Sequence, residues 1–356
     1  MRALVAALLL VCVAIVSISA NCQAEVLKLK TVTVLQPIPA PDIRFAPWAV
    51  AIERGWLAEE GLKIDMQTTN GSIIVAQQVL NGNAEYGLPA PEATVVARIK
   101  GAPLRYFYGI TSRNPFPLAI LRDGPVKSLS DLKGSDIGVF SLTAVQFYTT
   151  QAILQSVGFK LNRDYRLLGV GAGTAPLRAL QDGTISALSL NALAYAEYEN
   201  RGTRLAYLTT PEIDPILAWG LMATDSYLAA NRREAVGLAR AFTKGRIYCA
   251  ENPESCIKAY LGQFPTARTA GLSEKRAVEA QLRTLKIFFD YSPRPTNGLW
   301  GSYDRAAWAA IVKYMLESGQ SERAIDPTLM YTNDLIVEIN QFDANQIAAD
   351  AATAGQ

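Results

Sequence analysis

Histidine is absent from this sequence of 356 residues, and its absence narrows the chemistry that the chain can perform. Without histidine there is no Ser-His-Asp or Cys-His nucleophilic machinery and no zinc site of the usual histidine-bearing kind. Cysteines at Cys-x-x-Cys spacing, which would indicate a redox or metal site, are also missing. We therefore expect no catalytic residues, no metal and no cofactor. The chemistry that remains is binding.

Short loops ahead of four expected helices carry groups that could hold a small ligand. These loops are Asn70-Gly71-Ser72, Pro89-Ala90-Pro91, Ser141-Leu142-Thr143-Ala144 and Asn191-Ala192. In an open α/β fold, ligands lie beyond the carboxyl ends of strands, where helix N-termini present free backbone N–H groups. Serine, threonine and asparagine are also ordinary N-cap residues, so helix capping alone is the competing interpretation.

The first 24 residues have the layout of a secretory signal peptide. Met1-Arg2 gives a positive start, residues 3–18 are apolar apart from Ser17, and small residues follow. A membrane anchor is the alternative, but the run is shorter than the ~20 residues that a spanning helix needs. Cleavage after Ala20 or after Ala24 fits the pattern, and the protein is then expected in the periplasm.

The cysteine count depends on the cleavage point. Cleavage after Ala24 leaves two cysteines, Cys249 and Cys256, which form an even pair in an oxidising compartment and predict a disulfide. Cleavage after Ala20 would also leave Cys22, either as an odd thiol or as the lipid-anchored residue of a lipoprotein. We favour plain secretion with one disulfide.

Charge and length limit the classes of partner. The 34 basic and 32 acidic residues give a formal charge of +2, without a basic run, so neither nucleic acid nor an anionic membrane surface is an expected partner. Removal of 24 residues leaves about 330, enough for two lobes of ordinary domain size. We expect a monomer.

Strands and helices alternate through residues 30–208, which favours largely parallel α/β sheets. The expected strands are residues 31–35, 63–67, 84–87, 104–110, 118–121, 136–140, 165–170, 185–190 and 204–208. The clearest helices between them are residues 47–59, 73–81, 143–156 and 175–181. Gly171-Ala172-Gly173 also echoes Asn70-Gly71-Ser72 about 100 residues later, which suggests two lobes of one plan.

After Thr224 the pattern becomes helical, over residues 226–249, 253–261, 273–289 and 303–318. These helices cannot bury their apolar faces alone, so we expect them to pack back on the first lobe. The expected division is 25–115 for the first part of lobe 1, 116–215 for lobe 2 and 216–342 for the rest of lobe 1. Crossings fall near residues 111–117 and 209–219, and residues 343–356 are an expected loose tail.

Four segments in order resemble a known family of proteins. They read FAPWAVAIERGWLAEEGLKIDMQTTNGS, AQQVLNGNAEYGLPAPEATVVARIKGAP, VKSLSDLKGSDIGVF and LRALQDGTISALSL. The series resembles the solute-binding proteins of ABC importers for alkanesulfonates, taurine, nitrate and thiamine-precursor pyrimidines. The resemblance implies the type II periplasmic binding protein fold, an α/β fold in which two hinge crossings join two lobes around a ligand cleft.

The resemblance adds candidate ligand contacts at Gln36, which ends the first strand, and at Arg44-Phe45. The planar guanidinium of Arg44 could pair with a sulfonate or carboxylate. Trp48, in the first turn of a helix that Pro47 opens, could wall an aromatic ligand or pack in the core. Trp219 lies on the second crossing, within reach of the cleft.

These expectations define a periplasmic solute-binding component of an ABC importer, which closes around a small anionic or aromatic solute and delivers it to a permease. An enzyme of the same fold is the alternative, because the fold also hosts enzymes. The pyrimidine synthase within this resemblance relies on an active histidine and a cysteine-rich motif, and neither is present here. A periplasmic receptor for a sensor kinase is a third candidate.

Overall fold

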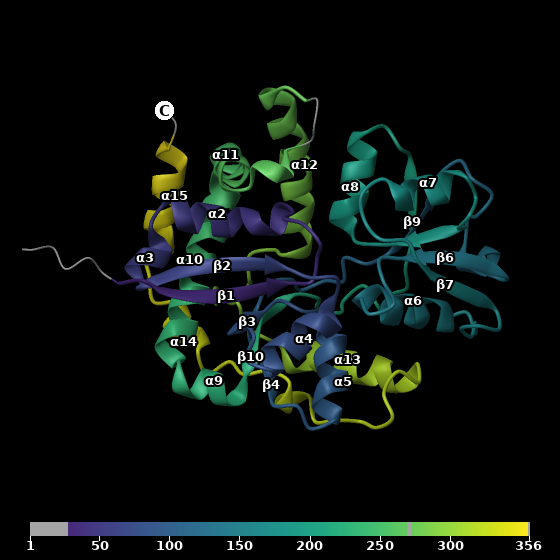
Figure 1. Ribbon diagram of the computed structural model, residues 1–356, viewed down its shortest axis with the longest axis horizontal. Helices are drawn as coiled ribbons and strands as arrows, with labels where there is room; N and C mark the ends of the chain where they lie inside the picture. The colour runs from purple at the N-terminus through teal and green to yellow at the C-terminus, as the bar shows by residue number, and fades with distance from the viewer. Residues whose placement is uncertain (1–27, 269–271, 355–356) are drawn as a thin grey trace, which may run out of the picture.

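The computed structural model describes residues 28–268 and 272–354, which form two lobes, each built on its own five-stranded sheet (Figure 1). The expected signal peptide, its two cleavage points and Cys22 lie outside the described residues. Across the described part of the chain, no helix combines the length and the apolar character needed to cross a membrane.

The sheet of lobe 1 has the strand order β2-β1-β3-β10-β4. Its strands are β1 (Lys30–Gln36), β2 (Leu62–Thr68), β3 (Tyr86–Gly87), β4 (Leu104–Gly109) and β10 (Gly220–Thr224). The sheet of lobe 2 has the order β7-β6-β8-β5-β9. Its strands are β5 (Leu118–Leu121), β6 (Ser135–Val139), β7 (Tyr165–Gly169), β8 (Ala187–Ser189) and β9 (Leu205–Leu208).

Both sheets are mixed, with one strand that runs against the other four. In lobe 1 this strand is β10, which pairs antiparallel with β3 and β4, and in lobe 2 it is β5, which pairs antiparallel with β8 and β9. Each is the first strand after a crossing between the lobes. The chain enters each lobe at the edge where the parallel strands end, so the entering strand must run the other way. The sheets are therefore largely parallel, as expected, with one antiparallel strand in each lobe.

Helices cover both sheets near the expected positions. Those before the helical end are α2 (Ala46–Glu53), α3 (Trp56–Glu59), α4 (Ser72–Leu80), α5 (Pro91–Ile99), α6 (Val145–Gln155), α7 (Ala175–Gln181) and α8 (Ala192–Asn200), with 3₁₀ helices η1 (Ile43–Phe45) and η2 (Leu129–Leu132). The single helix expected over 47–59 is divided into α2 and α3, because Gly55 adopts a left-handed φ of 74°.

The helical end packs on lobe 1, as expected. It contains α9 (Asp225–Ala230), α10 (Arg232–Glu251), α11 (Pro253–Gln263), η3 (Pro265–Ala267), α12 (Glu274–Tyr291), α13 (Arg305–Glu317), η4 (Pro327–Leu329), α14 (Ile336–Ile339) and α15 (Ala344–Thr353). Helix α10 lies so close to α2 that a Cβ at Gly245 would be 2.1 Å from the carbonyl oxygen of Pro47. Glycine is required at this crossing of two helices.

The expected loose tail at 343–356 is wrong over most of its length, because it forms helix α15. Ile347 and Ala351, four residues apart, bury one face of this helix against α10. The side-chain amide of Asn252 donates to the carbonyl oxygens of Ala351 (2.8 Å) and Ala354 (2.9 Å). The final turn is therefore attached to the start of α11.

The predicted disulfide is confirmed between Cys249 of α10 and Cys256 of α11. Both cysteines are fully buried, and their Cα atoms are 4.9 Å apart. The bond fixes the sharp turn at Asn252-Pro253 between two helices of lobe 1.

The two lobes contact each other at three places. Ser141 Oγ of lobe 2 donates to the carbonyl oxygen of Asn70 in lobe 1 (3.2 Å). Asn200, at the end of α8, donates to the carbonyl oxygen of Ala280 in α12, and these two helices lie side by side in Figure 1. On another side, Gln320 donates to the carbonyl oxygen of Tyr148 in α6 (2.8 Å). The lobes are closed on each other in this structure.

Candidate ligand-binding site

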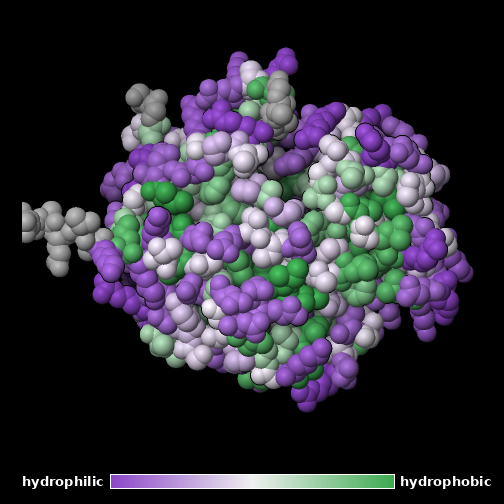
Figure 2. Space-filling model, in the orientation of Figure 1, coloured by the Kyte–Doolittle hydropathy of each residue, from purple (hydrophilic) through white to green (hydrophobic). Residues whose placement is uncertain are grey.

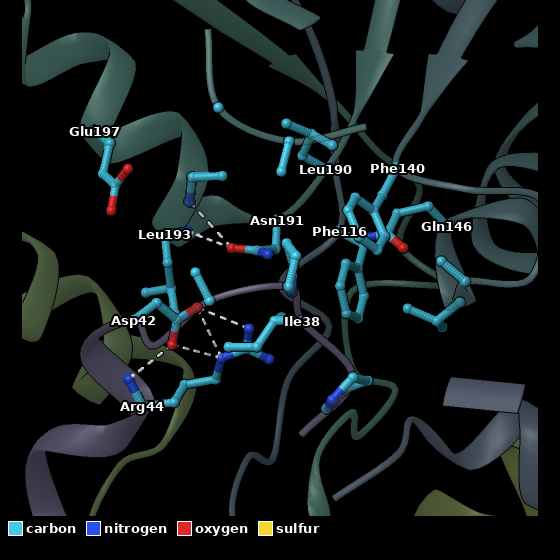
Figure 3. Close-up of a pocket in the computed structure, with 18 of the residues that line it drawn as sticks. Ile38, Asp42, Arg44, Phe116, Phe140, Gln146, Leu190, Asn191, Leu193 and Glu197 are labelled. Carbon is cyan, nitrogen blue, oxygen red and sulfur yellow. Dashed lines mark hydrogen bonds and ion pairs between the residues drawn. The ribbon is translucent and has the colours of Figure 1, made fainter. Parts of the chain in front are cut away.

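A cavity of about 280 Å³ lies between the lobes and is lined from both of them. Figure 2 shows the surface hollowed where the two lobes meet, and Figure 3 shows the side chains inside. The lining comprises residues 37–42, Arg44, Ser72 and Trp219 from lobe 1 and the second crossing, and Phe116, Phe140, residues 144–146, residues 172–174, Leu190, Asn191, Leu193, Ala194, Glu197, Tyr198 and Arg201 from lobe 2 and the first crossing.

Five residues predicted from the sequence line this cavity. They are Arg44, Ser72, Ala144, Asn191 and Trp219. They come from five different segments of the chain: four of them lie at or next to the start of a helix, and Trp219 directly precedes strand β10. This arrangement is the one expected for an α/β fold, in which such ends meet at one edge of each sheet.

Phe45 and Trp48 belong to the core of lobe 1 and do not line the cavity. Both are fully buried. The Trp48 ring lies 4.4 Å from that of Phe242 in α10, and the Phe45 ring meets Phe264 edge-on at 5.1 Å. The core interpretation of Trp48 is the one that the structure supports.

The loops at Asn70-Gly71 and Ser141-Leu142-Thr143 contact each other instead of lining the cavity. Thr143 Oγ1 lies 3.4 Å from the carbonyl oxygen of Asn70, and a Cβ at Gly71 would be 3.0 Å from the carbonyl oxygen of Thr143. Leu142 is exposed. These loops face each other across the lobes, and the ligand cavity lies beside their contact.

Pro89, Ala90 and Pro91 serve the packing of lobe 1 and do not reach the cavity. The backbone N–H of Ala90 donates to Ser72 Oγ at 3.0 Å, which ties the start of α5 to the start of α4. The carbonyl oxygen of Pro89 accepts from Tyr106 Oη at 2.9 Å. Ser72 thus lines the cavity, and its hydroxyl oxygen accepts a hydrogen bond from the neighbouring loop.

Arg44 does not present a free positive charge to the cavity. Its Nε and Nη2 donate to both carboxylate oxygens of Asp42, at 2.7 to 3.1 Å, and Asp42 also accepts from the Arg44 backbone N–H (Figure 3). The guanidinium lies 4.3 Å from the ring centroid of Trp219, and its side chain is 5% exposed. A bidentate pair of this kind, stacked on an indole, holds the guanidinium in one orientation.

Asn191 caps helix α8 and has donors left for a ligand. Its Oδ1 accepts from the backbone N–H groups of Leu193 (3.0 Å) and Ala194 (3.1 Å) (Figure 3). Among the described residues, no acceptor is bonded to its Nδ2. The same side chain therefore satisfies the helix and can donate into the cavity, which combines the two interpretations open from the sequence.

Glu197 supplies a second carboxylate. Burial, together with the nearby negative charge of Asp42, raises the pKa of its carboxyl above the ordinary value, while Arg201 lowers it. The charged side chains that line the cavity are thus Asp42, Arg44, Glu197 and Arg201, which sum to zero formal charge.

Two buried glutamine amides have unsatisfied hydrogen-bonding groups: Gln146 lines the cavity, whereas Gln36 does not line it but directly precedes the lining residue Pro37. Gln36, at the end of β1, is 1% exposed and neither amide atom has a partner. Gln146, at the start of α6, lines the cavity, and its Oε1 has no donor. Buried amides normally find partners, so these atoms indicate places for ligand or water.

Sequence reasoning missed the lobe 2 face made by Phe116, Phe140, Leu193, Glu197 and Tyr198. Leu193, Glu197 and Tyr198 lie on a face of α8, whereas Phe140 directly follows β6 and Phe116 belongs to the first crossing. Nothing in one sequence shows that side chains at these positions face a cavity. Two signals were present. Residues 37–42 carry three prolines directly after the first strand, and the echo at residues 171–173 marks a loop whose Ala172 and Gly173 line the cavity.

Within the described ranges, no group of three or more Asp, Glu and Cys side chains is placed to hold a metal ion. Two α/β lobes, two crossings and a cavity lined from both lobes define a two-lobed binding protein of the periplasmic binding protein fold. The chain belongs to the NMT1/THI5 like family, which matches residues 42–256.

Known proteins are similar to this chain at low identity. Riboflavin-binding protein RibY of Chloroflexus aurantiacus is 22% identical over 298 residues, which cover 83% of each chain. The formylaminopyrimidine-binding protein of Halalkalibacterium halodurans is 22% identical over 276 residues, 75% of this chain and 79% of that protein. The periplasmic aliphatic sulphonate binding protein SsuA of Escherichia coli has the same fold, with a TM-score of 0.64 at 14% identity over 86% of this chain and 99% of that one.

Proposed function

We propose that this protein is the periplasmic solute-binding component of an ABC importer and that its ligand is a small, flat, aromatic heterocycle without net charge. The ion pair of Asp42 with Arg44, stacked on Trp219, carries the proposal for the ligand. Asp42 already occupies the Nε and Nη2 side of the Arg44 guanidinium and balances its charge, so a sulfonate or nitrate would have to compete with the Asp42 carboxylate for this group. A neutral ring meets no such competition.

The remaining lining supports the same ligand class. Phe116, Phe140, Trp219 and Leu193 provide apolar and aromatic walls, and Asn191 and Gln146 provide amide groups that can pair with ring nitrogens and exocyclic oxygens. A volume of about 280 Å³ lies just below the usual range of ligand pockets, about 300–1,000 Å³, and suits one or two rings. Two relatives are named for riboflavin and for a pyrimidine, which are aromatic heterocycles.

Ligand capture works through closure of the lobes. Arg44 belongs to lobe 1, Asn191 and Glu197 belong to lobe 2, and Trp219 lies on the second crossing. A ligand that touches all of them binds more tightly when the lobes are closed and so shifts the population toward that state. The closed form is the one that the permease would recognise.

The ligand is released unchanged under this proposal. The sequence has no histidine. Glu197 is the one carboxylate of the cavity without a close ion-pair partner among the described residues, and no serine, threonine or tyrosine hydroxyl of that part of the chain is hydrogen-bonded to it. Time-dependent conversion of a bound ligand, followed by mass spectrometry, would instead indicate the enzyme alternative.

The test is isothermal titration of the mature protein with riboflavin, formylaminopyrimidine, ethanesulfonate and nitrate. We expect one of the two heterocycles to bind at micromolar or lower Kd, and we expect no measurable binding of the two anions. Trp219→Ala should weaken the heterocycle by at least tenfold, while Trp56→Phe, a change in the core near Tyr248, should not. Saturable binding of the anions alone would refute the proposed ligand class.

A further inference from the structure

A second cavity, of about 890 Å³, lies at the hinge and shares no lining residue with the ligand cavity. We name it the hinge groove and define it by Ile110 and Thr111 of the first crossing, Leu217 of the second crossing, and the segment 293–304 that runs between α12 and α13. Both connections between the lobes therefore form part of its wall.

A buried arginine without a counterion lines the hinge groove. Arg246, in α10, is 2% exposed. Its Nη2 donates to the carbonyl oxygen of Ser292 at 3.0 Å and to Ser292 Oγ, and its Nη1 donates to Tyr108 Oη at 3.3 Å. Its Nε has no hydrogen-bond partner, and within residues 28–268 and 272–354 no carboxylate forms an ion pair with it.

Neutral partners compensate this charge only in part. The guanidinium lies 4.6 Å from the ring centroid of Trp300, which adds a cation–π contact. A guanidinium removed from water normally requires an anion, because neutral oxygens do not replace its lost hydration. A paired arginine such as Arg240, which binds Glu60 at 2.8 Å on the same helix, shows the ordinary arrangement.

The charges around the groove also favour an anion. Besides Arg246, the charged residues of the lining are Arg294 and Asp304. Asp304 is the N-cap of α13, and its Oδ1 accepts from the backbone N–H of Ala306 at 2.9 Å. The lining thus carries a net formal charge of +1, with its one carboxylate already engaged.

The rim of the groove is apolar. Leu299 is 37% exposed and Val337 is 64% exposed, and both line the groove. An occupant with an anionic group near Arg246 and a short hydrocarbon part under this rim would satisfy both features. That description fits an aliphatic carboxylate.

Arg246 is connected to the hinge by hydrogen bonds. Ser292 Oγ, which receives one of its bonds, donates to the carbonyl oxygen of Ile110 at 2.6 Å. Thr111 follows Ile110 in the chain, and its Oγ1 accepts from the backbone N–H groups of Ala218 (3.1 Å) and Trp219 (2.9 Å). An occupant that fixes Arg246 and Ser292 therefore acts on the segment that positions Trp219 in the ligand cavity.

We propose that the hinge groove is a second binding site, for an organic carboxylate paired with Arg246, and that its occupancy changes the affinity of the ligand cavity. This site is distinct from the proposed solute site. The existence of this second site does not depend on which solute binds between the lobes. The coupling between the two sites follows because both crossings belong to the wall of the hinge groove.

The test is titration of the mature protein with hexanoate and with hexanamide, which has the same shape without the charge. We expect saturable binding of hexanoate and at least tenfold weaker binding of hexanamide. Arg246→Met keeps an aliphatic stem and should reduce hexanoate affinity at least tenfold. Val337→Glu, at an exposed position that cannot endanger the fold, should do the same by repulsion.

Two controls locate the binding. Arg178→Met removes a positive charge from exposed α7 of lobe 2 and should leave hexanoate affinity unchanged. Asn191→Leu alters the ligand cavity and should weaken the solute but not hexanoate. Absence of saturable hexanoate binding, equal binding of hexanamide, or full retention in Val337→Glu would overturn the site. An unchanged solute Kd at saturating hexanoate would overturn the coupling.

Discussion

Among the charged residues of the ligand cavity, Asp42 determines how Arg44 can interact with a ligand. Its carboxylate occupies the Nε and Nη2 edge of the Arg44 guanidinium, which a ligand anion could otherwise use. Arg44 alone, as seen in the sequence, is an attractive partner for a sulfonate. Because Asp42, two residues earlier, pairs with this side chain, the guanidinium is neutralised and held against the ring of Trp219.

Asp42→Asn should therefore turn the cavity into an anion site. The freed guanidinium keeps its place on Trp219 and loses its carboxylate, so we expect ethanesulfonate affinity to rise at least tenfold, about 1.4 kcal/mol. Calorimetric titration measures the change. Asp182→Asn, at an exposed position after α7, removes the same charge outside the cavity and should have no effect. Equal ethanesulfonate affinity in the two variants would contradict this account.

Glu92 is a buried carboxyl at the start of α5, and it makes stability depend on pH. It is 2% exposed, Tyr314 Oη donates to its Oε1 at 2.5 Å, and its Oε2 has no partner. Burial raises its pKa to about 7, although the bond from Tyr314 acts in the opposite direction. The folded protein thus binds a proton that the unfolded chain releases near pH 4.5.

The free energy of unfolding should consequently fall as pH rises from about 4.5 to about 7, by about 3 kcal/mol from this residue. Glu92→Gln removes the titrating group, so the variant should match the parent near pH 4.5 and exceed it at pH 8 by up to that amount. Urea unfolding at several pH values measures the difference. Glu279→Gln, on exposed α12, is the matched control. A constant difference between Glu92→Gln and the parent across this range would exclude the mechanism.

Four of the five residues that sequence reasoning placed in the cavity share one property. Arg44, Ser72, Ala144 and Asn191 all stand at helix starts, where loop composition marks the position. Glu197, one turn and a half into α8, has no such mark, because its use depends on how α8 faces Asp42 across the lobes. A single sequence does not show which helix face lies opposite a residue of the other lobe.

At the scale of elements, strands followed by clear helices were predicted to within one or two residues, and exceptions have physical causes. β10 was missed because its sequence, GLMAT, contains one β-branched residue and no aromatic residue, so it lacks the composition typical of a strand. Helix α15 was missed because its composition is rich in Ala, Asp and Gln, while its stability comes from burial of Ile347 and Ala351 against α10.

The turn between α10 and α11 is held by the Cys249–Cys256 disulfide. The closed loop is short, so the loop-entropy relation gives a stabilisation of about 2.5 kcal/mol. We expect the Cys249→Ala, Cys256→Ala variant to lose at least this much, since both sulfurs are also buried. Unfolding in denaturant, with the parent protein measured with and without reductant, separates the cross-link from the lost packing. Identical midpoints for the reduced and oxidised parent would contradict a stabilising role.

At the scale of the whole molecule, closure depends on a contact that only glycine permits. Gly71 has φ 139°, and its missing Cβ leaves room for the carbonyl of Thr143 in the opposite lobe. Two other inter-lobe contacts, at α8 with α12 and at Gln320 with Tyr148, lie on different sides. An obstacle at Gly71 would therefore hold the lobes apart at the edge nearest the ligand cavity without altering either lobe's core.

Gly71→Trp should keep the fold and lose ligand-dependent stabilisation. A ligand at 100 times its Kd adds about 2.7 kcal/mol to the parent, because it binds only the folded, closed form. The variant cannot close, so we expect most of this increment to vanish in thermal unfolding, and small-angle scattering to show an extended molecule with ligand present. Gly82→Trp carries similar left-handed strain, at φ 73°, with open space around the missing Cβ, and should keep the increment. If Gly71→Trp retains it in full, the lobes do not need this contact to capture the ligand, and capture must proceed from an arrangement more open than the one seen here.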